Sequence, residues 1–351
     1  MKTSSTTQRH AEPSRPDVVI DEASLRALAM AACGNAGIAP AHARLQVDLL
    51  VEAELRGRAS HGLLRLPRII ERIANGVADP AAKGSHNWLG ASLRVDGQMG
   101  LGPVVAMEAI EAMLAHLDRN GVCIAAISNN NHLGMLAWYA EQVAGRGRVF
   151  IGLSTSEALV HPWGGRHAML GTNPVAIGIP TSAGPFVLDM ATSLVAMGTV
   201  HDYAGRGMPI PPGWALDENG DPTTDAARAR NGALAPFGEA KGYALGLAFE
   251  LLVTAMTGAA IGRDVAGTLD SDRICNKGDL FVVLDPSRQS GLLARLAAFL
   301  DEIRQSGDGD PVLVPGDRAR SSRDRARSVG MAIPAALHTR LVALAKKEVF
   351  H

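Results

Sequence analysis

Several patterns that assign a function quickly are missing from this chain of 351 residues. No GxGxxG follows an apolar run and no GxxxxGK[ST] occurs, which argues against the usual dinucleotide and P-loop phosphate sites. There is no GxSxG and no HExxH, so a nucleophile-elbow hydrolase and a typical zinc protease are disfavoured. The three cysteines, Cys33, Cys123 and Cys275, show no CxxC spacing, and we expect neither a disulfide framework nor a structural zinc site.

Excess charge of one sign is also missing. Lys and Arg number 34 against 35 Asp and Glu, and no basic stripe with interleaved aromatics occurs, so we expect no nucleic-acid partner. The longest apolar run, 244–262, carries Glu250 in its middle, which favours a helix packed within the protein or against a partner subunit over a membrane span. Residues 1–17 are polar without the apolar core of a secretory signal. We interpret them as a disordered tail of a cytoplasmic protein.

The periodicity of apolar residues predicts an α/β layer architecture. We expect two domains after the tail, a helical one of residues 18–88 with about 297–346, and an α/β one of residues 89–296. The predicted helices cover 25–32, 41–55, 63–73, 103–116, 133–144 and 335–346. The predicted strands cover 87–95, 122–128, 149–154, 175–179 and 311–314, with a short apolar run at 186–188 and a hairpin-like turn at 218–221.

The segment Ser60–Pro67 is the most informative of the motifs that are present. His61 and Arg65 are four residues apart at the predicted start of a helix, so they should project from one face. A histidine can move a proton near neutral pH, and an arginine grips a carboxylate with two parallel bonds. The alternative is a solvated basic turn, because Arg56, Arg58 and Arg68 crowd the same region.

Four further segments place polar groups beside predicted strands or helix starts. His132 follows a strand and precedes a helix, where it would sit neutral beside an anion or simply cap the helix. Thr172 stands in a Pro-containing turn and contacts a ligand or satisfies the turn itself. Asp189 ends a short apolar run, and it pairs with a histidine or caps the following helix. Lys241, between two glycines, reaches a phosphate or ribose or is merely exposed.

Taken in order, these segments resemble the type-2 malate/L-lactate dehydrogenase family. That family also contains ureidoglycolate, sulfolactate and diketogulonate oxidoreductases and a cyclic-imine (piperideine-2-carboxylate) reductase. The resemblance runs from about residue 21 to residue 346. Its blocks are SHGLLRLP (60–67), NNNHLGMLAWYA (129–140), PWGG (162–165), GTNPVAIGIP (171–180), LDMATS (188–193), PPGWALDENGDPTTD (211–225), APFGEAKGYALGLAFELL (235–252) and PGDR (315–318).

The resemblance implies an NAD(P)-dependent oxidoreductase whose nucleotide site is not a Rossmann site. It implies a helical N- and C-terminal domain, an α/β domain with a largely antiparallel sheet, and a homodimer. The implied catalytic residues are His61 as proton donor, Ser60 orienting its ring, His132 as a second acid–base candidate, and Asp189. Arg65 would clamp the substrate carboxylate and Thr172 would contact the substrate. The implied cofactor contacts are His132, Leu133, Gly134, Ser156, Asp189, Met190, Ala191, Lys241, Pro315, Gly316 and Asp317, and no metal is expected.

Two departures from the family pattern bear on the cofactor. Glu239 stands where many members have an uncharged residue, and Thr199 stands where a lysine is common. Both disfavour a 2′-phosphate, so we expect NAD, with NADP as the alternative. The expected reaction is hydride transfer between nicotinamide and a small 2-hydroxy or 2-oxo acid. The alternatives are reduction of a cyclic imino acid on the same fold, a metal-dependent lyase or hydrolase, and a catalytically silent binding protein.

Overall fold

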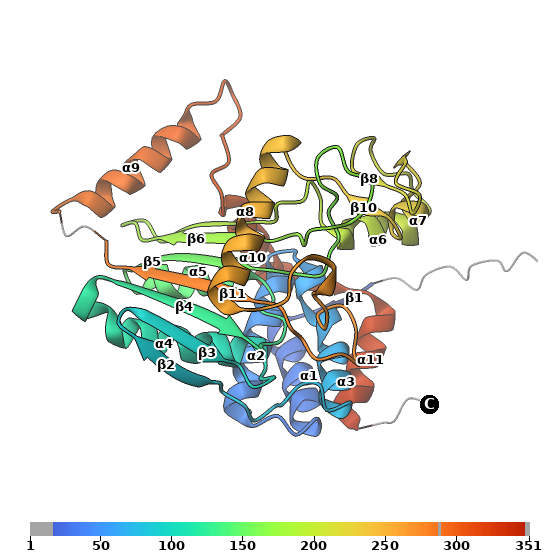
Figure 1. Ribbon diagram of the computed structural model, residues 1–351, viewed down its shortest axis with the longest axis horizontal. Coiled ribbons are helices and arrows are strands. Elements are labelled where there is room, and N and C mark those ends of the chain that lie inside the picture. The colour runs from blue at the N-terminus through green and yellow to red at the C-terminus, as the bar shows by residue number, and fades with distance from the viewer. Residues whose placement is uncertain (1–16, 287–288, 348–351) are drawn as a thin grey trace, which may run out of the picture.

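A seven-stranded sheet forms the centre of the computed structural model, which describes residues 17–286 and 289–347 (Figure 1). Its strand order is β2-β3-β4-β11-β5-β6-β7, and only the β3–β4 pair is parallel. The expected α/β architecture with a largely antiparallel sheet is therefore confirmed. The strands are β2 (Ser85–Leu89), β3 (Ser92–Asp96), β4 (Val122–Ser128), β5 (Val149–Ser154), β6 (Val175–Ile179), β7 (Phe186–Met190) and β11 (Asp279–Leu284).

Helices cover both faces of this sheet. Because successive side chains of a strand point to opposite faces, Ala125 and Ile127 pack with α4 (Gly102–Asn120) and α5 (Leu136–Gly145). Ala126, between them, faces the other way and packs with Val253 of α8 (Ala240–Thr257). Near-continuous apolar strands such as β4 are what a sheet buried on both faces requires.

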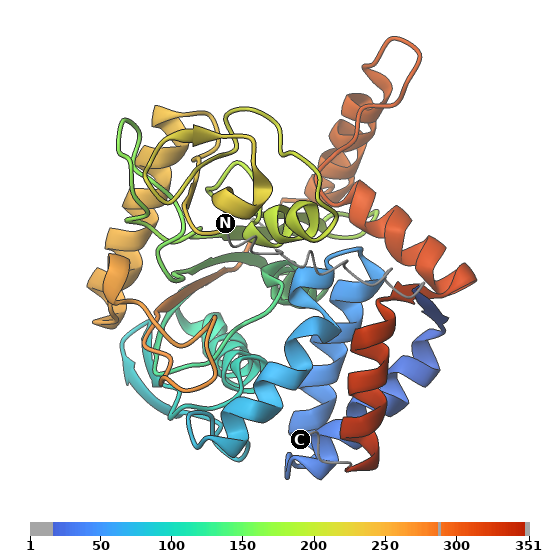
Figure 2. The ribbon, with the colours of Figure 1, turned by 90° about the vertical axis from the view of Figure 1, so that its right-hand side faces the viewer.

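A second hydrophobic cluster holds a helical part made from both ends of the chain, visible in Figure 2. A short sheet joins β1 (Val18–Ile20) to β12 (Met331–Ile333) beside it. Residues of α2 belong to both clusters, Leu50 to the helical one and Leu49 to the sheet one, so α2 ties the two parts together. The helices are α1 (Glu22–Asn35), α2 (Pro40–Leu55), α3 (Leu66–Ala74) and α11 (Ala335–Lys346).

A smaller region and a protruding arm complete the fold. The arm is α9 (Leu292–Gln305), which projects from the body in Figures 1 and 2 and leaves Phe299 57% exposed. Helix α10 (Asp317–Val329) leads the chain back. The smaller region has its own cluster and contains α6 (Met197–Gly205), β8 (Ala215–Leu216), β9 (Pro222–Thr223), α7 (Ala226–Ala229) and β10 (Ala233–Leu234). A short turn, η3 (Gly262–Asp264), follows α8.

Several predicted boundaries are wrong for identifiable reasons. Residues 87–95 do not form one strand but parts of two, β2 and β3, because Gly90 adopts φ 60° and turns the chain between them. Pairing with β3 also extends β2 back to Ser85. The helix expected from residue 133 begins at Leu136, and the one expected from residue 63 begins at Leu66. Residues 311–314 are not a strand. In the described part of the chain, none of the helices combines the length and apolarity needed to cross a membrane.

Candidate functional site

The sheet topology brings most of the predicted site residues to one edge. Strands β4 and β5 both pair antiparallel with β11, so they run in the same direction and end at the same edge. His132 follows β4 and Ser156 follows β5. By the same alternation, Thr172 precedes β6 and Ala191 follows β7 at this edge, which we call the site edge.

The motif that carries His61 and Arg65 is not a single α-helix, which corrects the expectation. It consists of two 3-10 turns, η1 (Ala59–His61) and η2 (Leu63–Arg65), separated at Gly62. The cause is Glu54, whose carboxylate accepts a hydrogen bond from the Leu63 N–H at 2.7 Å. A Cβ on Gly62 would lie 2.2 Å from Glu54 Oε1, so glycine is required where the two turns meet. The side-chain relation of His61 to Arg65 is therefore set by this contact and not by helical spacing.

The two predicted histidines nevertheless meet. The rings of His61 and His132 are stacked with centroids 5.8 Å apart. Ser60 Oγ lies 3.1 Å from His61 Nδ1, as expected for an orienting hydroxyl. The Gly134 N–H donates to His132 Nδ1 at 3.1 Å, so His132 carries its proton on Nε2 when neutral.

Burial keeps both rings uncharged near neutral pH. It lowers the pKa of His61 to about 4, with Arg65 and Arg58 repelling the imidazolium further. Burial also lowers the pKa of His132 well below its usual value, helped by Arg65 and His61. We expected the positive end of a helix dipole to lower the pKa of His132, but α5 begins four residues later, so the dipole is not the main cause.

Arg65 is positioned with its ligand-binding atoms free. Its Nε donates to the Ser60 carbonyl at 2.7 Å, and among the described residues nothing bonds its terminal nitrogens. Burial and Arg68 lower its pKa to about 10, whereas Glu157 acts in the opposite direction. A cavity opens at this point, lined by Gln46, Arg65, Arg68, Ile69, Arg72, Ala78, Leu101, Gly102, Asn131, His132, Gly267 and Thr268.

Ser156 and Thr172 form a second pair at the site edge. The Thr172 N–H donates to Ser156 Oγ at 3.0 Å, and the two hydroxyl oxygens are 3.3 Å apart. The buried Glu250 of α8 holds the neighbouring Asn173 by accepting from its Nδ2 at 2.6 Å. This explains the carboxylate inside the apolar run of α8, which here stabilises the turn before β6.

Asp189 has a different partner from either that we predicted. It lies within β7 and accepts a hydrogen bond from the Ala137 N–H, in the first turn of α5, at 2.8 Å. It therefore caps a helix that precedes it by about fifty residues, and it bonds neither a histidine nor the following helix. Burial raises its pKa. The next residue, Met190, pairs with Val175 in the sheet.

The remaining predicted cofactor contacts lie in differing surroundings. Leu133 is in the sheet core, and Gly134 adopts φ 71° tight against Leu49. Lys241 is exposed in the first turn of α8. The carboxylate of Asp317 is occupied by Arg304, which with Arg320 lowers its pKa to about 2. Pro315 and Gly316 form the turn before it, and Gly316 approaches the backbone of β7.

Other residues of the site were not singled out from the sequence. Glu157 fixes a loop over the cavity by accepting from the N–H groups of Thr268 and Leu269, at 2.7 and 2.9 Å. The buried Lys277 pairs with Asp279 at 2.5 Å, which in turn holds Asn130 beside His132. Glu157 is 111 residues from Thr268, and Asn130 is 149 residues from Asp279, so these contacts leave no local signal in the sequence.

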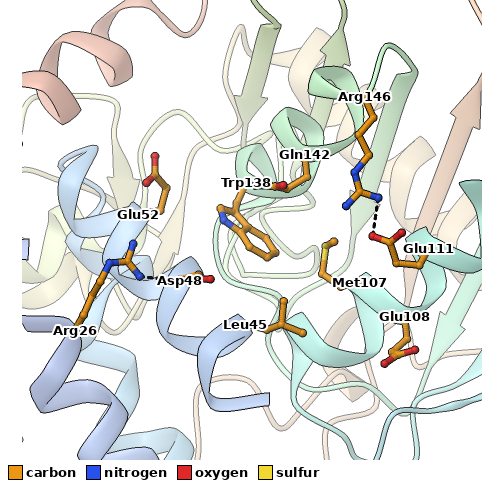
Figure 3. Close-up of a pocket in the computed structure, with 10 residues that line it drawn as sticks. All are labelled: Arg26, Leu45, Asp48, Glu52, Met107, Glu108, Glu111, Trp138, Gln142 and Arg146. Atoms are coloured by element: carbon orange, nitrogen blue, oxygen red, sulfur yellow. Dashed lines mark hydrogen bonds and ion pairs between the residues drawn. The ribbon is translucent and has the colours of Figure 1, made fainter. Parts of the chain in front are cut away.

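A larger cavity lies away from the predicted site residues. It is about 560 Å³, lies between α2, α4 and α5, and is lined by none of the predicted residues (Figure 3). Ion pairs already occupy its charges, Arg26 with Asp48 at 2.5 Å and Arg146 with Glu111 at 2.6 Å. Trp138 forms part of its wall.

Comparison with known proteins assigns the class. The fold matches a crystal structure of a dehydrogenase from Sinorhizobium meliloti, with a TM-score of 0.90 and 51% identity over 93% of this chain and 98% of that one. By fold the chain is thus a dehydrogenase. The profile of the malate/L-lactate dehydrogenases matches residues 20–342, and the chain belongs to that family.

Two relatives of this family have different substrates in their names. A malate/(S)-sulfolactate dehydrogenase of Methanothermus fervidus is 33% identical over 93% of this chain and 97% of its own length. A Delta(1)-pyrroline-2-carboxylate/Delta(1)-piperideine-2-carboxylate reductase of Pseudomonas aeruginosa is also 33% identical, over 93% of this chain and 98% of its own. Identity alone does not choose between these two chemistries.

Proposed function

We propose that this chain transfers a hydride between NAD(P) and a small 2-hydroxy acid, forming the 2-oxo acid, at the site edge. One observation carries the proposal. A neutral, half-buried histidine, His61, lies in the same motif as Arg65, whose terminal nitrogens bond no described residue. A 2-hydroxy acid offers the two groups that this pair needs, a hydroxyl proton and an adjacent carboxylate.

The donor set of the site edge fits a nicotinamide dinucleotide. Two buried amide oxygens there, Asn130 Oδ1 and Asn173 Oδ1, have no hydrogen-bond donor among the described residues, and a carboxamide N–H would satisfy such an acceptor. Ser156 offers a hydroxyl, and Lys241 offers a cation in the first turn of α8 for the phosphates. We propose that the other expected contacts, from His132 to the Pro315–Asp317 turn, border the same non-Rossmann site. When bound, the nicotinamide accepts or supplies the hydride.

The protein residues then orient the acid and move its proton. Arg65 holds the carboxylate with its terminal nitrogens, while the Ser60 carbonyl fixes the Nε end. In the oxidation direction, the neutral His61 accepts the hydroxyl proton and becomes an imidazolium. In the reduction direction, that imidazolium returns the proton to the carbonyl oxygen, an effect worth about 10²- to 10⁴-fold in rate.

Substrate binding also prepares His61 for reduction. Arg65 repels a proton on His61 in the free enzyme and contributes to its low pKa. A carboxylate bound to Arg65 offsets this positive charge, so the pKa of His61 rises in the complex. His132 with its Nε2–H donates a hydrogen bond to the substrate oxygen, and we propose it as an orienting group while His61 transfers the proton. For Asp189 we propose a positioning role, because its carboxylate caps α5, the helix that follows His132.

We propose NAD as the favoured cofactor, because the exposed Glu239 beside Lys241 disfavours a 2′-phosphate. We also propose a cytoplasmic homodimer. Apolar side chains on the exposed faces of α8 and α9 support the dimer. Leu251, Leu252 and Phe299 are 51%, 46% and 57% exposed, and a partner subunit would bury them. Light scattering on the full chain tests the dimer, and a monomeric mass would refute it.

The reaction is tested by following nicotinamide absorbance with 2-oxo acids and with cyclic imino acids, using NADH and NADPH in parallel. We expect 2-oxo acids to be reduced and His61→Ala to lose about 10²- to 10⁴-fold in kcat. Activity on imino acids alone would instead favour the reduction of a cyclic imino acid as the function. Full activity of His61→Ala would refute the proton-transfer role.

A further inference from the structure

The cavity beside Arg65 contains more positive charge than one carboxylate requires. Arg65 and Arg68 both line it, three residues apart at the start of α3. Arg72 lines it too, but its guanidinium is fully used, bonding Asn131 Oδ1 at 3.1 and 3.0 Å and the Asp270 carbonyl at 2.9 Å. Arg72 is therefore structural, whereas the terminal nitrogens of Arg65 bond no described residue.

Arg68 has no such structural role. Among residues 17–286 and 289–347, no carboxylate or carbonyl lies within bonding distance of its guanidinium, although the side chain is half-buried. It also stands in the first turn of α3, where the positive end of the helix dipole disfavours a cation. The neighbouring Arg65 adds repulsion, and Glu157, an acid that acts on Arg65, already accepts bonds from the Thr268–Leu269 loop. Arg68 is thus held where folding alone would not favour it.

A second polar residue, Gln46, supports the same interpretation. Gln46 of α2 is only 2% exposed and lines the same cavity, yet its amide makes no hydrogen bond to any described residue. Its amide therefore remains available to a ligand atom in this cavity. Gln46 and Arg68 together offer N–H donors to this cavity in addition to those of Arg65, while Ile69 and Leu101 contribute apolar side chains to its wall.

We propose that Arg68, assisted by Gln46, binds a second anionic group of the substrate, so that this enzyme takes doubly charged 2-hydroxy and 2-oxo acids. The inference rests on the proposed function and narrows it. Arg65 neutralises the carboxylate next to the reacting carbon, and Arg68 neutralises a terminal carboxylate or sulfonate. A cyclic imino acid or lactate has a single negative charge and would leave Arg68 without an anionic partner.

Matched substrates test this directly. We compare 2-oxosuccinate and 3-sulfopyruvate with 2-oxosuccinamate, in which the terminal acid is a neutral amide of almost the same size. We expect kcat/KM for a dianion to exceed that for the amide by about 10- to 100-fold, the usual range for a charge-assisted hydrogen bond. Whichever dianion is preferred identifies the terminal group as carboxylate or sulfonate, and either preference supports the proposal.

Variants assign the preference to the two residues. In Arg68→Gln the dianion-to-amide ratio should fall to within about threefold, with Arg68→Lys retaining part of it. Gln46→Leu should lower the ratio less, and Arg44→Gln, an exposed arginine on α2, should leave it unchanged. Binding of NADH, followed by fluorescence, checks that each variant is folded.

Two results overturn the proposal. One is a wild-type enzyme that reduces dianion and amide equally well, which would leave the proposed function intact. The other is an Arg68→Gln variant that loses activity on all substrates equally, because that is the behaviour of a structural residue. Absence of activity on every 2-oxo acid would instead refute the proposed function itself.

Discussion

Glu54 should make the stability of this protein fall as the pH rises through neutrality. Burial raises the pKa of its carboxyl from 4.5 to about 7, while the Leu63 N–H opposes this rise. Between these two values the unfolded chain releases the proton and the folded protein keeps it. The free energy of unfolding therefore decreases with pH, by about 3 kcal/mol in total at 1.36 kcal/mol per pH unit. This stabilisation is fully present below pH 4.5 and is lost as the pH rises past about 7.

Glu54→Gln removes the titration and keeps an acceptor for the Leu63 N–H. We expect urea unfolding at pH 4.5–8.5 to show the wild type losing about 3 kcal/mol relative to this variant. Taking the difference between the proteins cancels the titration of all other groups. The exposed Glu302→Gln should give a flat difference and serves as control. A flat difference for Glu54→Gln as well, or one that rises with pH, would refute the reasoning.

Three further outcomes follow from particular positions. Glu239 adopts φ 58° and ψ −123°, a conformation that favours glycine, so Glu239→Gly should stabilise the protein by about 1 kcal/mol, seen as a higher urea midpoint; no change or a decrease contradicts the strain. A Cβ on Gly102 would lie 2.1 Å from the His132 carbonyl oxygen, so Gly102→Ala should displace His132 and reduce kcat by about 10- to 100-fold, and unaltered steady-state kinetics would count against this contact. Because the pKa of His61 is about 4, kcat/KM for oxidation should stay level from pH 8 down to about 5, and a decline centred near 6.5 would exclude His61 as the base.

The strands that the sequence predicts best are those whose boundaries are local. Val122–Ser128, Val149–Ser154 and Val175–Ile179 are apolar runs flanked by turn residues, and the structure has the same limits. β11 and β12 were not predicted. β12 exists because it pairs with β1 at the other end of the chain, which a local pattern does not contain. The division into two domains stays a prediction.

For the site, the residue types were more informative than their geometry. Ser60, His61 and His132 come together as the motifs suggest, but the turn that aims His61 depends on Glu54, and the rings meet through the sheet topology. Asp189 shows the limit most clearly. A short strand ending in Asp predicts that the acid needs a partner, but not that the partner is the backbone of α5.

The position of β11 has a consequence for how the protein is made. β4 and β5 are consecutive strands of the chain, but β11, which begins at Asp279, lies between them. While the chain is being synthesised, both strands stay without their central neighbour until more than a hundred further residues have appeared. We therefore expect the site edge to form late, in a slow step dominated by non-local contacts. Until then the unpaired strands are exposed to aggregation.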